Sequence, residues 1–532
     1  MEKQKGGWTR VIVVILAVVI GIPGVVTLAL GGILAQRYLC PAPPPPYSNI
    51  VESVSAPVCR YLGPAPTPEY SDIVEHFKYG SIGSEVSGLP YAVWKALPDL
   101  FPEKFNGKDL SVFGFLYETD ANGNKRDLPI GLSRRTIQGV ERAWFNCALC
   151  HTGTARKTAD GSQQIVPAMP SNNLDLHAFT AFVVDIADSP QLSPDKLIPA
   201  MKKAGANIDW LDEQVWRYVA IPRLREALIE TRASLGPLLA YQPAWGPGRV
   251  DTFNPYKVVQ FHQQFSDLTD AEKIGVADFP SIFNQGPRGQ QMMELHWDGN
   301  NPSLQERNLS AALGAGVTEQ SVDHASIERV ADWLQNLHPP VSPYRPDQKQ
   351  VEAGRQIYMT HCAACHGSQG PDGYVFEGSA LGKVEPNATL GADKSRLDSY
   401  TEKLLDYQLK LFKDVDGGKY RFRYFKKTDG YANLPLDGLW LRAPYLHNGS
   451  VPTLADLLSP ADQRPKSFVR GLDVLDSEKG GFEAPPCTPG EKAAKGFCFD
   501  TSVRGNWNGG HDYGVELPAT DKAALLAYLL TF

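Results

Sequence analysis

Two short cysteine–histidine motifs constrain this chain of 532 residues more than any other feature. The sequence reads Cys-Ala-Leu-Cys-His at 147–151 and Cys-Ala-Ala-Cys-His at 362–366, the C-x-x-C-H pattern by which c-type haem is attached. The cysteines can form thioethers with the vinyl groups on one porphyrin edge, and the adjacent histidine then reaches the iron. A zinc site would need four Cys/His ligands, and neither motif has a second cysteine pair nearby. We therefore expect two covalently bound c-type haems, attached through Cys147, Cys150, Cys362 and Cys365 and ligated by His151 and His366.

The segments around the motifs predict helices. Residues 137–151 and 351–365 carry apolar side chains at the i, i+3/i+4, i+7 spacing of a helix that leads into each motif. Two more helical stretches, 326–337 and 520–532, close the two halves of the chain. Cytochrome c domains begin and end with such helices. We expect a mainly α fold with few strands.

A second repeat indicates that the two halves are duplicated. Trp-Asp-Gly-Asn-Asn-Pro-Ser-Leu at 297–304 aligns with His-Asn-Gly-Ser-Val-Pro-Thr-Leu at 447–454. In each copy a turn leads into a helix start, an element that can position a side chain against a haem. The sequence predicts two cytochrome c-like domains in tandem with irregular insertions, at 71–340 and 341–532, the first with an insertion at about 155–285.

The N-terminal region suggests a membrane anchor. Residues 11–35 carry no charge and as a helix would span about 37 Å, more than a hydrocarbon core of about 30 Å. Basic residues precede this run, so residues 1–10 should stay cytoplasmic. A cleaved signal peptide is the alternative, but its apolar region would be about 7 to 15 residues long. We expect one transmembrane helix in the cell inner membrane, a proline-rich tether at 36–70, and the bulk of the chain in the periplasm.

Four cysteines lie outside the two motifs. They form two local pairs, Cys40 with Cys59 and Cys487 with Cys498. In an exported protein this spacing predicts two disulfides, and four free buried thiols are the alternative.

The charge balance excludes one class of partner. The chain has 52 Lys and Arg against 59 Asp and Glu, which gives a net charge of -7. It lacks the basic surplus that binding to a phosphate backbone usually needs. We expect no nucleic-acid partner.

Together the motifs resemble the bacterial di-haem cytochrome c peroxidase superfamily. The two C-x-x-C-H motifs, the Trp-Asp-Gly turn at 297–299 and Ala-Pro-Tyr-Leu-His-Asn-Gly-Ser at 443–450 carry the resemblance, which covers most of residues 75–532. The insertion, the paired turns and the tail at 505–514 are most similar to the rubber-oxygenase branch. The resemblance implies that the N-terminal haem is reactive, that the C-terminal haem is an electron reservoir, and that Trp297 bridges them.

The second haem departs from the peroxidase pattern. Peroxidases place a methionine ligand just before the histidine of the second turn, where this chain has Leu446. Resemblance to the rubber-oxygenase branch implies His511 as the distal ligand. His447 is the alternative ligand, although hydrogen bonding near a haem propionate is its favoured role. Arg442 is expected either at a propionate or in a surface salt bridge.

Candidates at the first haem are less specific. His296 precedes Trp297 and should face the distal side, where it would ligate the iron or act as acid/base for O–O cleavage. Met169 is another candidate ligand, with loop packing as its alternative. Glu319 is only loosely placed as a counterpart of the catalytic glutamate of peroxidases. Asp298 is a candidate calcium ligand between the domains.

The sequence thus predicts a periplasmic di-haem oxidoreductase that activates peroxide or dioxygen at the N-terminal haem. Electrons would come from a small redox protein or a quinol-linked donor, and would pass from the second haem through Trp297. Two alternatives stay open: an electron-transfer cytochrome with both irons capped, and oxidative cleavage of an apolar substrate in a pocket built by the insertion. The sequence does not indicate the oligomeric state.

Overall fold

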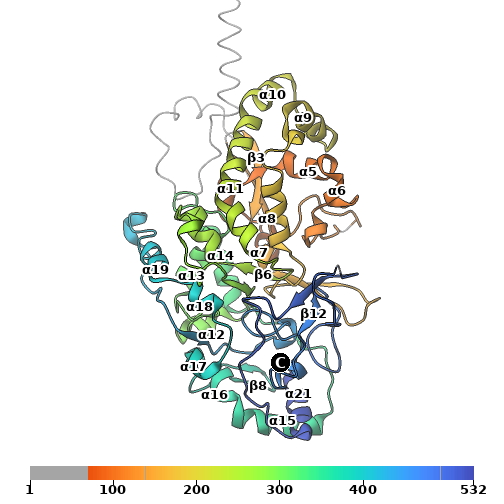
Figure 1. The fold of residues 1–532 in the computed structure, drawn as a ribbon, viewed down its shortest axis with the longest axis vertical. Coiled ribbons are helices and arrows are strands. Elements are labelled where there is room, and N and C mark those ends of the chain that lie inside the picture. Colours follow the sequence, from red (N-terminus) through yellow and green to blue (C-terminus); the bar gives the residue numbers. More distant parts are fainter. Residues whose placement is uncertain (1–69, 121, 138, 492) are drawn as a thin grey trace, which may run out of the picture.

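The computed structural model describes residues 70–120, 122–137, 139–491 and 493–532. This part of the chain is elongated, with helices α9 (Pro194–Lys203) and α10 (Trp210–Val215) at one end of its long axis and α15 (Gln348–His361), α16 (Ala363–His366) and α21 (Ala519–Leu529) at the other (Figure 1). The described residues include thirteen short strands in six antiparallel sheets of two or three strands. Strands are therefore more numerous than the sequence predicted.

The remaining helices of the first half are α4 (Ile73–Tyr79), α5 (Tyr91–Leu100), α6 (Pro102–Phe105), α7 (Cys147–Cys150), α8 (Leu176–Asp185), α11 (Ile221–Tyr241), α12 (Gln285–Gln290), α13 (Leu304–Gly314) and α14 (His324–Gln335). Those of the second half are α17 (Asn387–Leu390), α18 (Ser395–Ser399), α19 (Glu402–Gln408) and α20 (Leu454–Leu457). The strands are β1 (Leu89–Pro90), β2 (Leu132–Ile137), β3 (Val140–Phe145), β4 (Thr152–Ala155), β5 (Gln164–Pro167), β6 (Arg249–Asp251), β7 (Val276–Asp278), β8 (Ser368–Gly370), β9 (Gly373–Val375), β10 (Val384–Pro386), β11 (Gly430–Ala432), β12 (Ser467–Arg470) and β13 (Phe497–Asp500).

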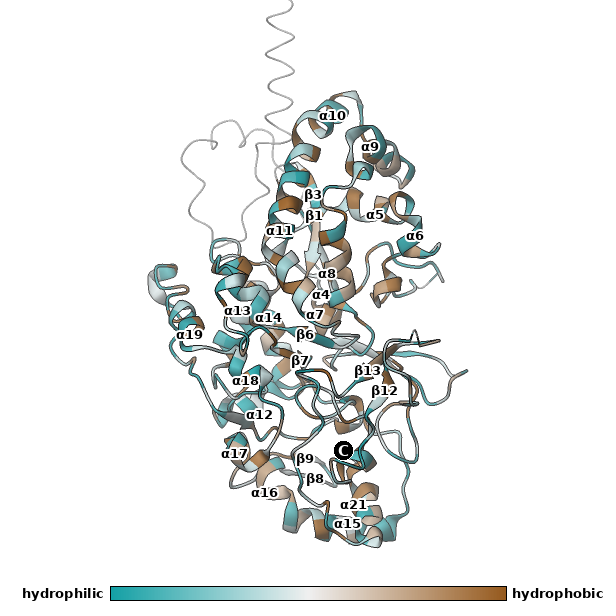
Figure 2. Ribbon diagram, viewed as in Figure 1, coloured by the Kyte–Doolittle hydropathy of each residue, from teal (hydrophilic) through white to brown (hydrophobic). Residues whose placement is uncertain are grey.

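The membrane-anchor prediction needs correction. Within the described ranges no helix is both long enough and apolar enough to cross a membrane. The longest of these helices, α11, has 21 residues but carries charged side chains such as Arg223, Glu226 and Arg232, and hydrophilic residues interrupt its apolar ones in Figure 2. Neither the transmembrane helix of the predicted fold class nor the inner-membrane location is supported by the described residues. Residues 11–35, on which both predictions rested, lie outside the described residues, as do Cys40 and Cys59.

The second half opens and closes with the helices that the sequence predicted. Asp347 caps α15 by accepting hydrogen bonds from the backbone of Lys349 and Gln350. Gly354 of α15 lies so close to α21 that a Cβ atom there would be 1.9 Å from the carbonyl oxygen of Ala524. The crossing of the two helices therefore requires a residue without a side chain at position 354.

The first half is built differently from the prediction. The expected helix at 137–151 is wrong, because residues 132–137 and 140–145 form the antiparallel strands β2 and β3, in which Ile137 pairs with Val140. Gly139 takes a φ of +73°, which suits a hairpin turn and not a helix. The opening helix is instead α4, where the rings of Phe77 and Trp333 of α14 lie 5.1 Å apart. The closing helix predicted at 326–337 corresponds to α14.

The repeated turns have the same backbone conformation. An isolated antiparallel bridge closes each turn. The residues before them, His296 and Leu446, both adopt left-handed φ angles, 62° and 67°. Gly299 and Gly449 follow with φ of 57° and 63°. Equivalent backbones therefore carry different side chains in the two halves.

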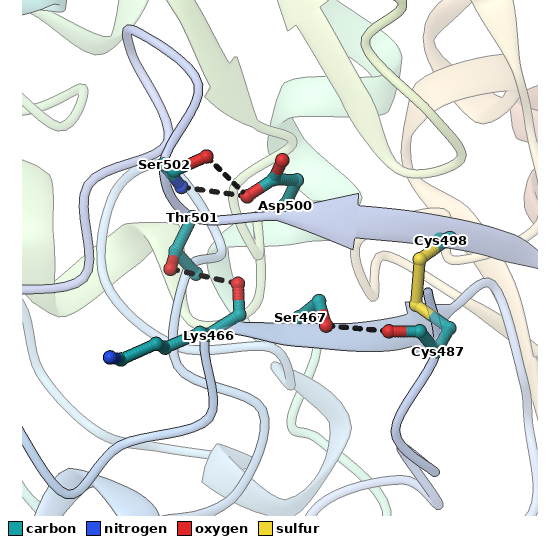
Figure 3. Close-up of a disulfide and its surroundings, with 7 residues drawn as sticks. All are labelled: Lys466, Ser467, Cys487, Cys498, Asp500, Thr501 and Ser502. Carbon is teal, nitrogen blue, oxygen red and sulfur yellow. Dashed lines mark hydrogen bonds between the residues drawn. A yellow bond between two sulfur atoms is a disulfide. The ribbon is translucent and has the colours of Figure 1, made fainter. Parts of the chain in front are cut away.

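Of the two predicted disulfides, Cys487–Cys498 is confirmed. The two Cα atoms lie 5.8 Å apart. The hydroxyl of Ser467 donates to the carbonyl of Cys487, 2.6 Å away, so the disulfide joins β13 to a segment already held against β12 (Figure 3).

Replacing Gly354 by alanine should destabilise the protein by about 1–3 kcal/mol or more, because the new methyl group overlaps the backbone of α21. Gly314→Ala is the matched control, since a Cβ there meets no atom within 4 Å and alanine favours a helix. Urea unfolding followed by circular dichroism measures both changes. Equal stabilities of the two variants would contradict the packing of α15 on α21.

Candidate haem centres

Both motif histidines are held in the same way. Nδ1 of His151 lies 3.0 Å from the carbonyl oxygen of Pro280, and Nδ1 of His366 lies 2.8 Å from that of Leu434. A carbonyl oxygen can only accept, so each Nδ1 carries the proton and each Nε2 keeps the lone pair that a metal needs. Pro280 comes just after β7 and Leu434 just after β11, so the two acceptors occupy equivalent positions.

The motif cysteines are available for attachment. Cys147, Cys150, Cys362 and Cys365 are the free cysteines of the described residues, and all four are half-buried. Burial raises the pKa of Cys147 to about 11 and that of Cys150 to about 12, which keeps both as thiols. Burial also lowers the pKa of His151 to about 3, so its imidazole is neutral. Thiols beside a neutral imidazole are the groups that c-type haem attachment requires.

His511 lies opposite His366. Their ring centroids are 6.1 Å apart and their planes differ by 43°. Two metal–nitrogen bonds of about 2 Å each, plus the distance from each nitrogen to its ring centre, come to about this separation. The backbone N–H of His511 donates to the carbonyl of Leu390 at 2.9 Å, which fixes the loop that carries it. The two imidazoles are therefore spaced to take one iron between them.

His447, the alternative ligand, is engaged elsewhere. Its Nε2 lies 3.0 Å from the hydroxyl of Tyr431, and the two rings stack with centroids 4.1 Å apart. The Tyr431 hydroxyl donates to the carbonyl of Asp393 at 2.5 Å, so it accepts from His447. Nε2 of His447 then carries a proton and has no lone pair for a metal.

Trp297 lies where the two halves meet. Its Nε1 donates to the carbonyl of Asp278 in β7 at 2.7 Å, and its own carbonyl accepts from the N–H of Ala432 in β11 at 2.8 Å. The backbone carbonyl of His447, at the equivalent position of the second turn, accepts a hydrogen bond from the N–H of Asp278 at 2.8 Å. Trp297 therefore connects the two strands that lead to the carbonyls behind the motif histidines.

His296 presents one nitrogen to its surroundings. Its Nδ1 lies 2.7 Å from Oδ1 of the fully buried Asn300, which accepts the Nδ1 proton. Burial, together with the charge of Arg307, lowers the pKa of His296 to about 4, so the ring is neutral with a lone pair on Nε2. Met169, by contrast, is fully buried in the main hydrophobic core.

A small space of about 40 Å³ lies next to residues of both centres. The residues that line it include Pro280 and Leu434, whose carbonyls bind the motif histidines. His296, Trp297 and three arginines, Arg288, Arg307 and Arg442, also line it. The structure thus brings together the candidates from the first turn and Arg442.

Two of these arginines share one buried carboxylate. Nη2 of Arg288 lies 2.5 Å from Oδ1 of Asp437, and Nη2 of Arg442 lies 2.8 Å from the same oxygen. Arg442 also donates to the carbonyl of Pro435 at 2.7 Å, while its Nε is buried without a partner. The surface salt bridge considered for Arg442 is therefore replaced by a buried one that leaves a donor unused.

Two arginines also share a single carboxylate around Asp278, at the end of β7. Arg470 contacts both carboxylate oxygens of Asp278 at 3.2 Å, and Arg249 lies 3.6 Å from one of them. Nε and Nη1 of Arg470 and Nε of Arg249 are buried and form no hydrogen bond within the described residues. Buried guanidinium groups with unused donors are costly unless an anion completes them. The propionates of haem supply such anions, so the residues present fit the group that the motifs imply.

Two weaker candidates lie away from this arrangement. The carboxylate of Asp298 is buried against Arg396 at 2.7 Å, so a guanidinium already compensates its charge. No group of three potential metal-binding side chains gathers within the described ranges, and the calcium prediction gains no support. The carboxylate of Glu319 accepts from the backbone N–H of Phe412 and does not line the space between the centres.

Sequence reasoning missed the charged residues around the centres. Arg288, Arg307 and Asp437 belong to no short motif, and their relations are visible only once distant segments meet. One signal was present: Arg288 follows Pro280 at the same offset as Arg442 follows Leu434, so aligning the two halves beyond the turns would have found it.

Comparisons with known proteins give a partial match. A family model described as RoxA-like, cytochrome c-like, matches residues 430–469, which include the second turn. Two proteins of Sinorhizobium fredii (strain NBRC 101917 / NGR234), both described as uncharacterized, are similar: y4iM is 29% identical over 251 residues, 44% of this chain and 57% of its own length, and y4iJ is 44% identical over 110 residues, 19% of this chain and 17% of its own length. The matches thus span little more than half of one relative and less than a fifth of the other.

The family match supports a likeness to rubber-oxygenase-like di-haem cytochromes, and does not extend to the whole peroxidase superfamily. A cytochrome c-like domain implies a covalently bound c-type haem and an oxidoreductase-type role.

Replacing His511 by alanine should remove the sixth ligand of the second haem and turn a low-spin signal into a high-spin one, with a higher reduction potential. His447→Gln is the matched control and should leave the spin state unchanged, because Nε2 of His447 is bonded to Tyr431. Optical and EPR spectra of the ferric proteins report both results. If the His447 variant alone became high-spin, the assignment of the two histidines would be reversed.

Proposed function

We propose that the protein is a di-haem oxidoreductase that activates peroxide or dioxygen at the haem held by His151, with the haem held by His366 as its electron reservoir. The observation that carries the proposal is an asymmetry between the two centres. His511 faces His366 with ring centroids 6.1 Å apart, whereas in the first half the turn residue His296 lies next to a small space and forms no hydrogen bond at Nε2 within the described residues. The proposed domains are 71–340, with the insertion at about 155–285, and 341–532.

The chain's own residues serve distinct steps in this proposal. When bound, the haem would supply the iron that binds the oxidant and the electrons that reduce it. His296 accepts the proton of hydrogen peroxide at Nε2 and returns it to the departing oxygen, which is general acid–base chemistry. Asn300 keeps the imidazole in the required tautomer through its bond to Nδ1.

Trp297 serves electron transfer in this proposal. It lies on the space between the two centres, and hydrogen bonds at both its indole and its carbonyl hold it to β7 and β11. A fixed aromatic ring there shortens the gap that an electron must cross. The electron donor is proposed to be a small redox protein or a quinol-linked carrier.

A second candidate function is oxidative cleavage of an apolar substrate. The RoxA-like family match favours it, and Phe279, Ile282 and Leu295 add apolar side chains to the lining of the same space. An electron-transfer cytochrome is the third candidate, and it requires Nε2 of His296 to cap the first iron.

Replacing His296 by glutamine should slow the reaction with hydrogen peroxide about 10²- to 10⁴-fold, the usual contribution of a positioned acid/base. Stopped-flow spectroscopy of the half-reduced holoprotein measures this rate. The exposed His338→Gln is the control and should react as the parent does. An unchanged rate in the His296 variant would remove its catalytic role, and a faster one would identify His296 as an iron ligand that blocks the site.

A further inference from the structure

Arg307 is a buried cation without an ion pair. It lies in the first turn of α13, and 8% of its surface is exposed. Among the described residues no carboxylate forms a salt bridge with it, whereas Arg288 and Arg442 on the same space share Asp437. A buried guanidinium without a compensating charge destabilises a fold. Such a group points to an anion that the protein chain itself does not provide.

The position of Arg307 connects it to the first motif. It lines the same space as His296 and Pro280, whose carbonyl holds His151. Its charge acts on Cys147, on His151 and on His296, in each case lowering the pKa of that group. Arg307 therefore lines the same space as His296, and its charge reaches the first motif.

Porphyrin geometry separates this position from the propionates. The cysteines bond the vinyl edge of the haem, and the two propionates extend from the opposite edge. Arg442 and Arg470, with their unused Nε donors, are available to propionates. A cation near Cys147 is left for a different anion.

We propose that Arg307 binds a small anionic oxidant, the hydroperoxide anion, beside His296. This deepens the proposed function and rests on it. Hydrogen peroxide gives one proton to Nε2 of His296, and the hydroperoxide anion that remains is paired with the guanidinium of Arg307. No electron moves in this step, and the charge of the ion pair is conserved because the imidazolium and the anion form together.

The test measures ligand binding and not turnover. Fluoride and azide are anionic probes for the ferric holoprotein, and carbon monoxide is a neutral probe for the reduced one. Arg307→Gln should weaken both anions about tenfold to hundredfold, the value of a hydrogen bond to a charged group, and leave carbon monoxide affinity unchanged. Arg307→Lys keeps the positive charge but lacks the forked donors of the guanidinium. Its affinity for the anions should lie between that of the parent and that of Arg307→Gln.

A surface variant separates local from general charge effects. Arg504 is exposed, donates to the backbone carbonyls of Asp270 and Ala271, and does not line the space that holds Arg307. Arg504→Gln therefore removes the same charge from the surface, and this variant should bind both anions as the parent does. Equal weakening in both variants would overturn the proposal, because it would show a long-range field.

Three further outcomes overturn it. If the parent protein binds the probes and Arg307→Gln binds the anions equally well, the role of Arg307 fails while the proposed function stands. If anion and carbon monoxide affinity fall together, or haem content falls, Arg307 supports the haem itself. If the parent binds none of the probes at either haem, the proposed function fails as well.

Discussion

The structure depends on one repeated hydrogen bond, from Nδ1 of each motif histidine to a backbone carbonyl just beyond a short strand. The partners lie 129 residues apart in the first half and 68 in the second. Each bond fixes the tautomer of an imidazole and anchors a motif to distant chain. The strands that precede these carbonyls, β7 and β11, also form hydrogen bonds with Trp297. The support of the motif histidines and the contact between the two halves therefore depend on the same two strands.

The repeated turns give both halves of the chain the same backbone, and different side chains at equivalent positions distinguish the two halves. His296 and Leu446 share a left-handed backbone, but only the first has a side chain that can bind metal or move a proton. Trp297 and His447 share the next position, where one lines the space between the centres and the other stacks on Tyr431. A tail without a counterpart in the first half adds His511 to the second centre. Equivalent backbones thus carry different side chains at the two centres, and this difference underlies the proposed function.

The sequence predicted those features that depend on residues close together in the chain. The helices α14, α15 and α21 and the disulfide Cys487–Cys498 follow from spacing within a few turns. The hairpin β2–β3 was missed because a short apolar pattern fits a helix or a strand, and the turn at Gly139 decides between them. The pair of Arg288 with Asp437 joins residues 149 positions apart, and only the folded chain brings them together. The unpaired Arg307 was invisible for the same reason.

In the proposed function, one haem is open to external ligands and the other is closed. EPR spectra of the ferric holoprotein before and after addition of cyanide test it most directly. One signal should change on addition of cyanide, and a second, low-spin signal with two histidine ligands should persist unchanged. Two low-spin signals that both stay unchanged on addition of cyanide would contradict an open haem and identify an electron-transfer cytochrome.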